Sequence, residues 1–159
     1  MVGKWGASAT LALVALGLAG CGRAAPHPHQ TARCATVSAP HVTVVVEVST
    51  HRVLDRCVVV ARTGASGEAV MRRSGVEIAL QHFSFGDAVC QLDRVPPAYT
   101  HCFSTGRPYW ALFVAPAHGL FRAASTGIQA VHLEAGEALG WRYVPAKGRA
   151  APPPLPRVR

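Results

Sequence analysis

The sequence predicts an α+β domain, in which a mixed or antiparallel β-sheet carries one short helix packed on it. Three observations lead to this prediction. A valine-rich run over residues 41–49 has the composition and the partial alternation of a strand. A single helix signal follows near residues 66–75, and later apolar runs are separated by turn residues.

The folded part of the chain begins with two predicted strands. The first, His41–Ser49, is rich in β-branched residues, and the second, Cys57–Arg62, holds consecutive valines. Residues 50–56 between them are polar, which favours a hairpin connection.

The one good helix signal comes next. Thr63 or Ser66 can accept hydrogen bonds from free amides at the start of the helix. Glu68 lies in the first turn, where a negative charge complements the helix dipole, and Gly75 can adopt the left-handed conformation that ends a helix. We therefore expect a helix of about ten residues.

The later segments share short apolar or alternating patterns that are typical of strands. These strands are expected at residues 76–83, 88–92, 109–114, 120–121, 128–132 and 139–143. Residues 84–87 and the polar residues after 132 supply turns between them.

Two proline-containing segments flank the predicted domain. Residues 21–40 are typical of a tether, and residues 146–159 of a disordered tail, in which Ala151–Pro156 favours an extended polyproline conformation. The folded domain is therefore expected to span residues 41–145.

The beginning of the chain has the layout of a bacterial secretory signal. One positive charge, Lys4, precedes an apolar run over residues 7–20, which is shorter than the roughly 20 residues that a membrane-spanning helix needs. The run ends in small residues directly before Cys21, as lipoprotein processing requires. We expect residues 1–20 to be removed and acylated Cys21 to anchor the protein to the outer side of the cell membrane. A membrane-spanning anchor and an ordinary cleaved signal are the alternatives.

The cysteine count agrees with export. If Cys21 carries lipid, four cysteines remain, and an even number in an exported domain predicts two disulfides. Of the three possible pairings we favour Cys34–Cys57 and Cys90–Cys102. Neither pair has the Cys-x-x-Cys spacing that is common in zinc sites, so we expect no metal centre there.

The formal net charge of +8 comes mostly from arginine, since the chain has two lysines, Lys4 and Lys147. This usage is typical of a GC-rich genome, and attraction to anionic lipid or wall polymer is the functional alternative. The arginines are scattered along the chain, and together with export this disfavours nucleic acid as a partner.

The sequence shows no catalytic or metal-binding pattern. Gly64–Gly67 approaches a Gly-x-Ser-x-Gly motif but has the wrong spacing, and helix capping explains Ser66. Among the eight histidines, His27 and His29 lie in the tether, and no pair has the helical spacing of a metalloenzyme. We expect neither an enzyme nor a metal protein.

Four aromatic residues form the best candidate for a ligand site: Tyr109, Trp110, Trp141 and Tyr143. Aromatic rings with polar tips are common at binding surfaces. The alternative is that the tryptophans fill the core, which the apolar neighbours of Trp110 favour.

Taken together, these features resemble a family of small exported domains. The motifs that carry the resemblance are Thr63-Gly64 before a short helix, Gly75, the cysteine-bounded loop with prolines, Tyr109-Trp110, Gly136 and Gly140-Trp141-Arg142-Tyr143. Over about residues 42–145 the chain is similar to the C-terminal domain of transcobalamin and intrinsic factor, and especially to short two-disulfide versions from high-GC Gram-positive bacteria.

The resemblance implies a β-grasp-like sheet with one helix, and two disulfides. In the vitamin carriers this domain closes over a corrin ring, above a separate helical barrel. Two departures are evident, because this chain has no barrel and continues after Trp110 with Ala111-Leu112-Phe113-Val114. No ligand contact is therefore transferred from the family.

The function expected from the sequence is that of a non-catalytic binding or interaction module on the outer face of the membrane. Its partners are the membrane itself, through Cys21, and a small ligand, for which a corrinoid such as cobalamin is one candidate. The alternative is a structural or partner-binding envelope lipoprotein with no small-molecule ligand.

Overall fold

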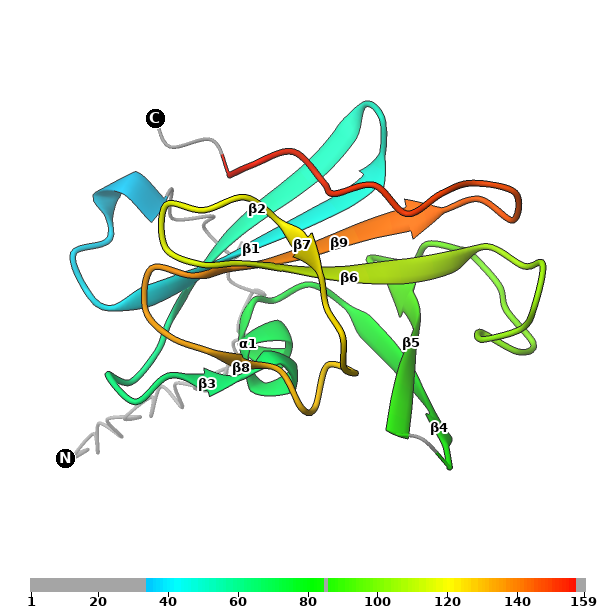
Figure 1. The fold of residues 1–159 in the computed structure, drawn as a ribbon, viewed down its shortest axis with the longest axis horizontal. Helices are drawn as coiled ribbons and strands as arrows, with labels where there is room; N and C mark the ends of the chain where they lie inside the picture. Colours follow the sequence, from blue (N-terminus) through cyan, green and yellow to red (C-terminus); the bar gives the residue numbers. More distant parts are fainter. Residues whose placement is uncertain (1–33, 85, 157–159) are drawn as a thin grey trace, which may run out of the picture.

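The computed structural model describes residues 34–84 and 86–156 (Figure 1). The fold is α+β, as expected, with many strands, one short α-helix and a mixed sheet. In chain order the elements are η1 (Cys34–Thr36), β1 (His41–Ser49), β2 (Arg52–Val59), β3 (Ala65–Ser66), α1 (Gly67–Arg73), β4 (Ile78–Phe83), β5 (Gly86–Leu92), β6 (Tyr109–Ala115), β7 (Arg122–Ala123), β8 (His132–Leu133) and β9 (Ala138–Val144).

The largest sheet has five strands in the order β2-β1-β9-β6-β7. β1 runs parallel to β9, with Val45 opposite Gly140, whereas the other neighbours in this sheet are antiparallel. Two long strands from opposite ends of the domain therefore lie side by side in the middle of the sheet (Figure 1).

The first hairpin is tighter than the sequence suggested. β2 begins at Arg52, so most of the predicted polar connection is strand, and residues 50–51 form the turn. The charged side chains of Arg52, Asp55 and Arg56 are accommodated because β2 is the edge strand of the sheet, where charge is common. The expectation of a connection over 50–56 was wrong for this reason.

The helix begins and ends as its capping residues predicted. Ser66 is the N-cap, and its hydroxyl accepts a hydrogen bond from the amide of Ala69 at 3.3 Å. Glu68 pairs with Arg72 one turn later. Gly75 has φ +72°, the left-handed conformation that follows a helix end. The helix has seven residues, fewer than expected, because Ser74 already caps its carboxyl end.

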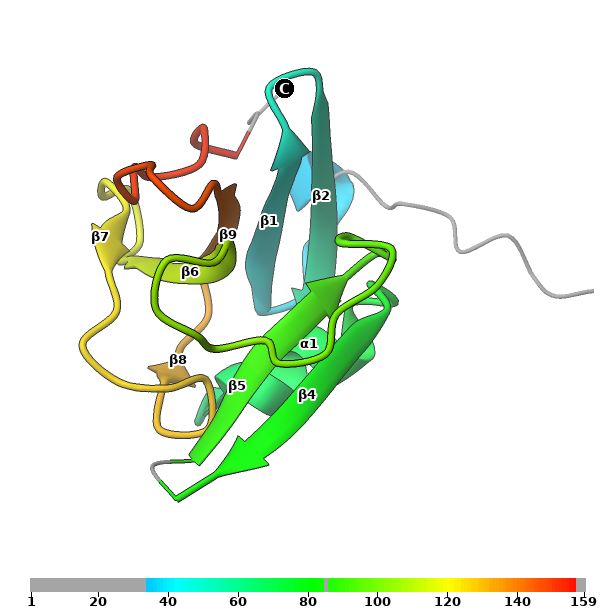
Figure 2. The same cartoon turned by 90° about the vertical axis from the view of Figure 1, so that its right-hand side faces the viewer.

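The remaining strands form two separate ribbons instead of extending the large sheet. β3 pairs with β8, and β4 pairs with β5. Figure 2 shows the β4–β5 hairpin beside α1 on one side of the large sheet. Its apolar side chains, Leu80, Val89 and Leu92, pack into the main core, which explains why this hairpin covers the sheet and does not join its edge.

Both faces of the large sheet are covered. On the face toward α1, here called the helix face, Val42, Val44 and Val46 of β1 are fully buried. On the opposite face, here called the outer face, Val45 packs with Phe113 and other residues of a second cluster. Burial on both faces explains why β1 is nearly continuous valine and does not alternate cleanly with polar residues.

The segment after β9 makes specific contacts as far as it is described. Pro153 is buried, and the carbonyl of Pro152 accepts a hydrogen bond from Arg142 at 3.1 Å. Gly140 makes room for this packing, since a Cβ there would lie 2.8 Å from Pro153 and 2.7 Å from Phe121. Within the predicted tail, Pro153 thus packs on the outer face where β9 has no side chain, whereas Pro152 and Pro154 are exposed.

Several sequence predictions fall outside the described residues. The signal peptide, Cys21 and the tether up to residue 33 all belong to this group. Within residues 34–84 and 86–156, no helix is long and apolar enough to cross a membrane.

Candidate functional site

The four aromatic residues chosen from the sequence do not form one site. Trp110 and Trp141 are 7% and 2% exposed and belong to the core on the helix face. Tyr109 packs on the outer face, because neighbouring residues of a strand point to opposite sides. Tyr143 is half-buried and lines a surface hollow.

The ring of Trp110 packs against the ring of Tyr143. The two residues are cross-strand partners of β6 and β9, and their rings lie 5.1 Å apart with planes tilted by 48°. The indole N–H of Trp110 donates a hydrogen bond to the carbonyl of Val95 at 3.0 Å. This contact attaches the loop after β5 to the sheet next to Tyr143.

The hollow has a volume of about 400 Å³, within the usual range for small-ligand sites. Most of its wall comes from the loop between β5 and β6. The lining residues are Cys90, Pro96, Ala98, Tyr99, Thr100, His101, Cys102, Arg107, Pro108 and Tyr143.

A disulfide between Cys90 and Cys102 holds this loop, as the sequence analysis expected. Two side-chain contacts add to it. The amide of Gln91 donates to the carbonyl of Pro96 at 2.6 Å, and the side-chain oxygen of Gln81 accepts from the backbone amide of Cys102 at 3.3 Å. The wall of the hollow is therefore fixed to β4 and β5 even though it consists of irregular chain.

The chemistry of the hollow is aromatic and basic. Tyr99 and Tyr143 supply rings, Arg107 and His101 supply nitrogen donors, and none of the lining residues is acidic. Burial raises the pKa of Tyr143 above its ordinary value of 10.0. Its hydroxyl is protonated at neutral pH, as that of any tyrosine is, and can donate a hydrogen bond. An arginine beside aromatic faces is suited to a flat ligand that carries a negative charge.

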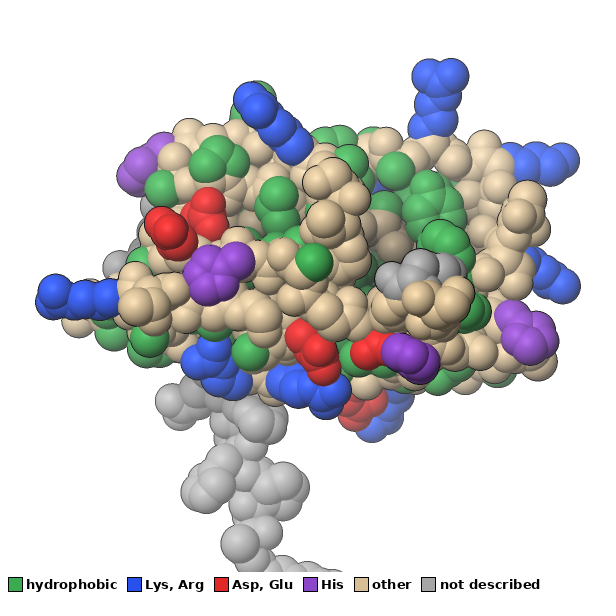
Figure 3. All heavy atoms as spheres, turned by 60° about the horizontal axis from the view of Figure 1, so that its bottom comes forward, with side chains coloured by type: hydrophobic (Ala, Val, Ile, Leu, Met, Phe, Trp, Pro, Cys, Tyr) green, Lys and Arg blue, Asp and Glu red, His purple; other side chains and the backbone are tan. Residues whose placement is uncertain are grey.

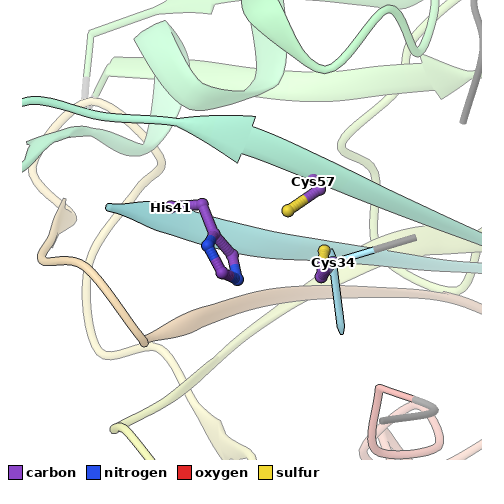
Figure 4. Close-up of side chains that lie close together, drawn as sticks. All are labelled: Cys34, His41 and Cys57. Carbon is purple, nitrogen blue, oxygen red and sulfur yellow. The ribbon is translucent and has the colours of Figure 1, made fainter. Parts of the chain in front are cut away.

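A second group of reactive side chains lies at the start of the large sheet (Figure 4). His41 comes from β1, Cys57 from β2 and Cys34 from η1, and one potential ligand atom of each lies within 4.8 Å of the others. All three side chains are half-buried. β-Sheet register creates the approach, because Thr43 lies opposite Cys57 and His41 is two residues before Thr43 on the same face.

Neighbouring groups orient this cluster. The Nδ1 atom of His41 lies 2.9 Å from the carbonyl of Ala39, which can only accept, so Nδ1 carries the proton. The hydroxyl of Thr43 donates to the sulfur of Cys34 at 3.4 Å. Burial, followed by the adjacent Cys34, raises the pKa of the Cys57 thiol to about 12 from 9.0.

The expected bridge between Cys34 and Cys57 is not formed in the structure, where both residues are free thiols. The closeness of Cys34 and Cys57 agrees with the pairing that the sequence analysis favoured, whereas the presence of His41 beside them was not foreseen. The linear spacing of these residues resembles no metal motif, and the hairpin register that unites them depends on a turn at 50–51 that the sequence analysis placed differently. A predicted hairpin with its turn at residues 50–51 would have placed Cys57 opposite Thr43, and so close to His41.

No protein-family model matches the chain, and no curated protein matches it.

Proposed function

We propose that this protein is a lipid-anchored module on the outer face of the cell membrane, and that it binds a small ligand without catalysing a reaction. Binding of a small ligand is supported by the hollow of about 400 Å³ beside Tyr143, whose wall is held by the Cys90–Cys102 disulfide. A fixed wall lowers the entropy cost of binding, because the loop is already ordered before the ligand arrives.

The residues of the hollow favour a particular ligand class. Tyr99 and Tyr143 can stack on a flat group, and Arg107 can pair with a carboxylate or phosphate. We therefore propose a small ligand with a planar part and an anionic part. A corrinoid is the candidate that the transcobalamin-like resemblance contributes, and a hollow of this volume would hold one edge of such a macrocycle.

The proposal includes the resemblance to the transcobalamin-like domains. Support comes from one helix against a mixed sheet whose first and last long strands run parallel, an arrangement compatible with a β-grasp-like domain. The anchoring part is supported by the sequence around Cys21, with its short apolar run and small residues before the cysteine.

The surface charge agrees with a role that does not involve nucleic acid. On the face drawn in Figure 3, lysine and arginine side chains are dispersed, and acidic side chains lie near several of them. Ion pairs such as Arg94–Glu77 and Arg72–Glu68 also compensate part of the positive charge of the domain. A stripe of unopposed positive charge, which nucleic acid binding favours, is not present on that face.

Anchoring is tested in a bacterial host by intact-mass measurement and by membrane fractionation. We expect a chain that begins at Cys21 and carries a diacylglycerol group, and we expect Cys21→Ala to release the protein from the membrane. A chain that retains Met1 with an unmodified Cys21 would contradict this part of the proposal.

Ligand binding is tested by calorimetry on the full chain with cobalamin, cobinamide, benzoate and phenyl phosphate. Binding of any of these should weaken in Tyr143→Phe and in Arg107→Gln. The matched controls are Tyr109→Phe and Arg122→Gln, since Tyr109 lies on the outer face and Arg122 on β7, away from the hollow. If none of the four compounds gives heat, the small-ligand proposal fails and the protein-partner alternative replaces it.

A further inference from the structure

Two thiols and an imidazole converge where β1, β2 and η1 meet. Sulfur and nitrogen atoms of Cys34, His41 and Cys57 lie within 4.8 Å of one another, although Cys34 and Cys57 come from different elements of the chain. In a tetrahedral zinc site, bond lengths of about 2.3 Å to sulfur place two sulfurs roughly 3.8 Å apart. The two sulfurs therefore need to approach each other by at most about 1 Å, and each sulfur needs to approach the imidazole nitrogen by at most about 1.3 Å, to surround one ion.

The groups around the cluster are those that metal sites use to orient their ligands. A ligating histidine commonly donates its other ring N–H to a carbonyl, and Nδ1 of His41 does so to Ala39 at 2.9 Å. This leaves Nε2 as the nitrogen with a free lone pair. The hydroxyl of Thr43 donates to the sulfur of Cys34, as it would to a thiolate.

We propose that Cys34, His41 and Cys57 form a zinc site with water in the fourth position. Binding converts both thiols to thiolates, with release of two protons, so the site containing neutral His41 and Zn²⁺ has no net charge. A neutral site suits half-buried ligands, because no uncompensated charge is placed below the surface. The partial exposure also leaves one side of the ion open to solvent.

This site is independent of the proposed ligand hollow. His41 and Cys57 lie on the outer face of the sheet, on the same side as Val45, whereas Tyr143 packs on the helix face. Failure of either proposal would thus leave the other unaffected.

The alternative state of the same residues is a disulfide between Cys34 and Cys57, which cannot hold zinc through those sulfurs. Peptide mapping of the chain isolated from its envelope without reductant, with free thiols blocked, distinguishes the two. We expect Cys34 and Cys57 to be recovered as blocked thiols or with bound zinc. Recovery of a Cys34–Cys57 bridge as the main form would overturn the proposal.

The binding test uses the full chain, kept without oxygen and without reductant so that the Cys90–Cys102 bridge stays closed, freed of metal, and then titrated with Co²⁺ and Zn²⁺. We expect one equivalent of Co²⁺ to give sulfur-to-cobalt charge-transfer absorption, and one equivalent of Zn²⁺ to remove it. Cys34→Ser or Cys57→Ser should lower that absorption by about half, since one of two thiolates is lost.

His41→Ala keeps both thiols and should weaken zinc binding by at least about 10–100-fold. Loss of a residue that only hydrogen-bonds to a metal ligand has an effect in this range, and loss of a ligand itself should have no smaller one. His51→Ala is its matched control, because His51 lies in the exposed turn of the same hairpin. Circular dichroism verifies that each variant is folded. Zinc affinity and cobalt spectra that are the same in the wild type, His41→Ala and Cys57→Ser would refute the site.

Discussion

Replacement of Arg142 by methionine tests how strongly one ion pair stabilises the outer face. The guanidinium of Arg142 on β9 lies 2.8 Å from a carboxylate oxygen of Glu47 on β1, and the two residues are neighbours in the parallel pairing. Their side chains are 29% and 8% exposed, and the second carboxylate oxygen of Glu47 has no hydrogen-bond partner among the described residues.

The magnitude follows from this geometry. Removal of one partner from a buried pair costs about 3–5 kcal/mol, because the other charge stays buried without compensation. Water reaches part of Arg142, so we expect a loss of about 3 kcal/mol for Arg142→Met. Glu47→Gln keeps an oxygen acceptor and should cost about 1–2 kcal/mol. The double variant Glu47→Met/Arg142→Met should lie within about 1 kcal/mol of the wild type, since neither charge remains.

Urea unfolding followed by tryptophan fluorescence measures these differences. With a slope of about 1.5 kcal/mol/M, a loss of 3 kcal/mol lowers the midpoint by about 2 M. Arg122→Met is the control, because Arg122 is exposed on β7 and should change stability by less than about 0.5 kcal/mol. Equal effects of Arg142→Met and Arg122→Met, or additive losses in the double variant, would refute the reasoning.

Three further predictions use the same unfolding assay. Cys90→Ala/Cys102→Ala should lose about 3 kcal/mol, because a bridge with a sequence separation of 12 no longer restricts the unfolded chain; an unchanged midpoint would contradict this. Gly140→Ala should cost about 1–3 kcal/mol by overpacking against Phe121 and Pro153, and a neutral result would mean that the terminal segment does not pack there. The raised pKa of Tyr143 implies stability that is fully present below the ordinary tyrosine pKa of 10.0 and is lost as pH rises through the folded value. Tyr143→Phe should reduce that alkaline loss, whereas Tyr109→Phe provides the comparison.

Local elements could be predicted from the sequence because their causes are local. The valines of β1, the capping hydroxyl of Ser66 and the glycine at 75 act within a few residues of their position, and each appears in the structure as expected. The start of β2 was misplaced because the charged residues Arg52, Asp55 and Arg56 are tolerated at a sheet edge, and edge position is a property of the whole fold.

In the candidate sites, too, contacts between residues close in sequence were predicted, and contacts that depend on the whole fold were not. The pairing of Cys90 with Cys102 links two residues close in sequence, and it was anticipated. Trp141 was undecided between core and ligand site, since its burial depends on pairing with a distant strand. The cluster of Cys34, His41 and Cys57 required the register of a hairpin, which no spacing rule contains.

The parallel contact between β1 and β9 has a consequence for how the chain is made. Synthesis proceeds from the amino terminus, so the β1–β2 hairpin emerges long before β9, and until then one edge of β1 has no partner strand. Closure of the domain therefore waits until β9 has been synthesised, which predicts slow folding with high contact order. Chains interrupted before residue 138 would present an unprotected valine edge and would be prone to aggregate.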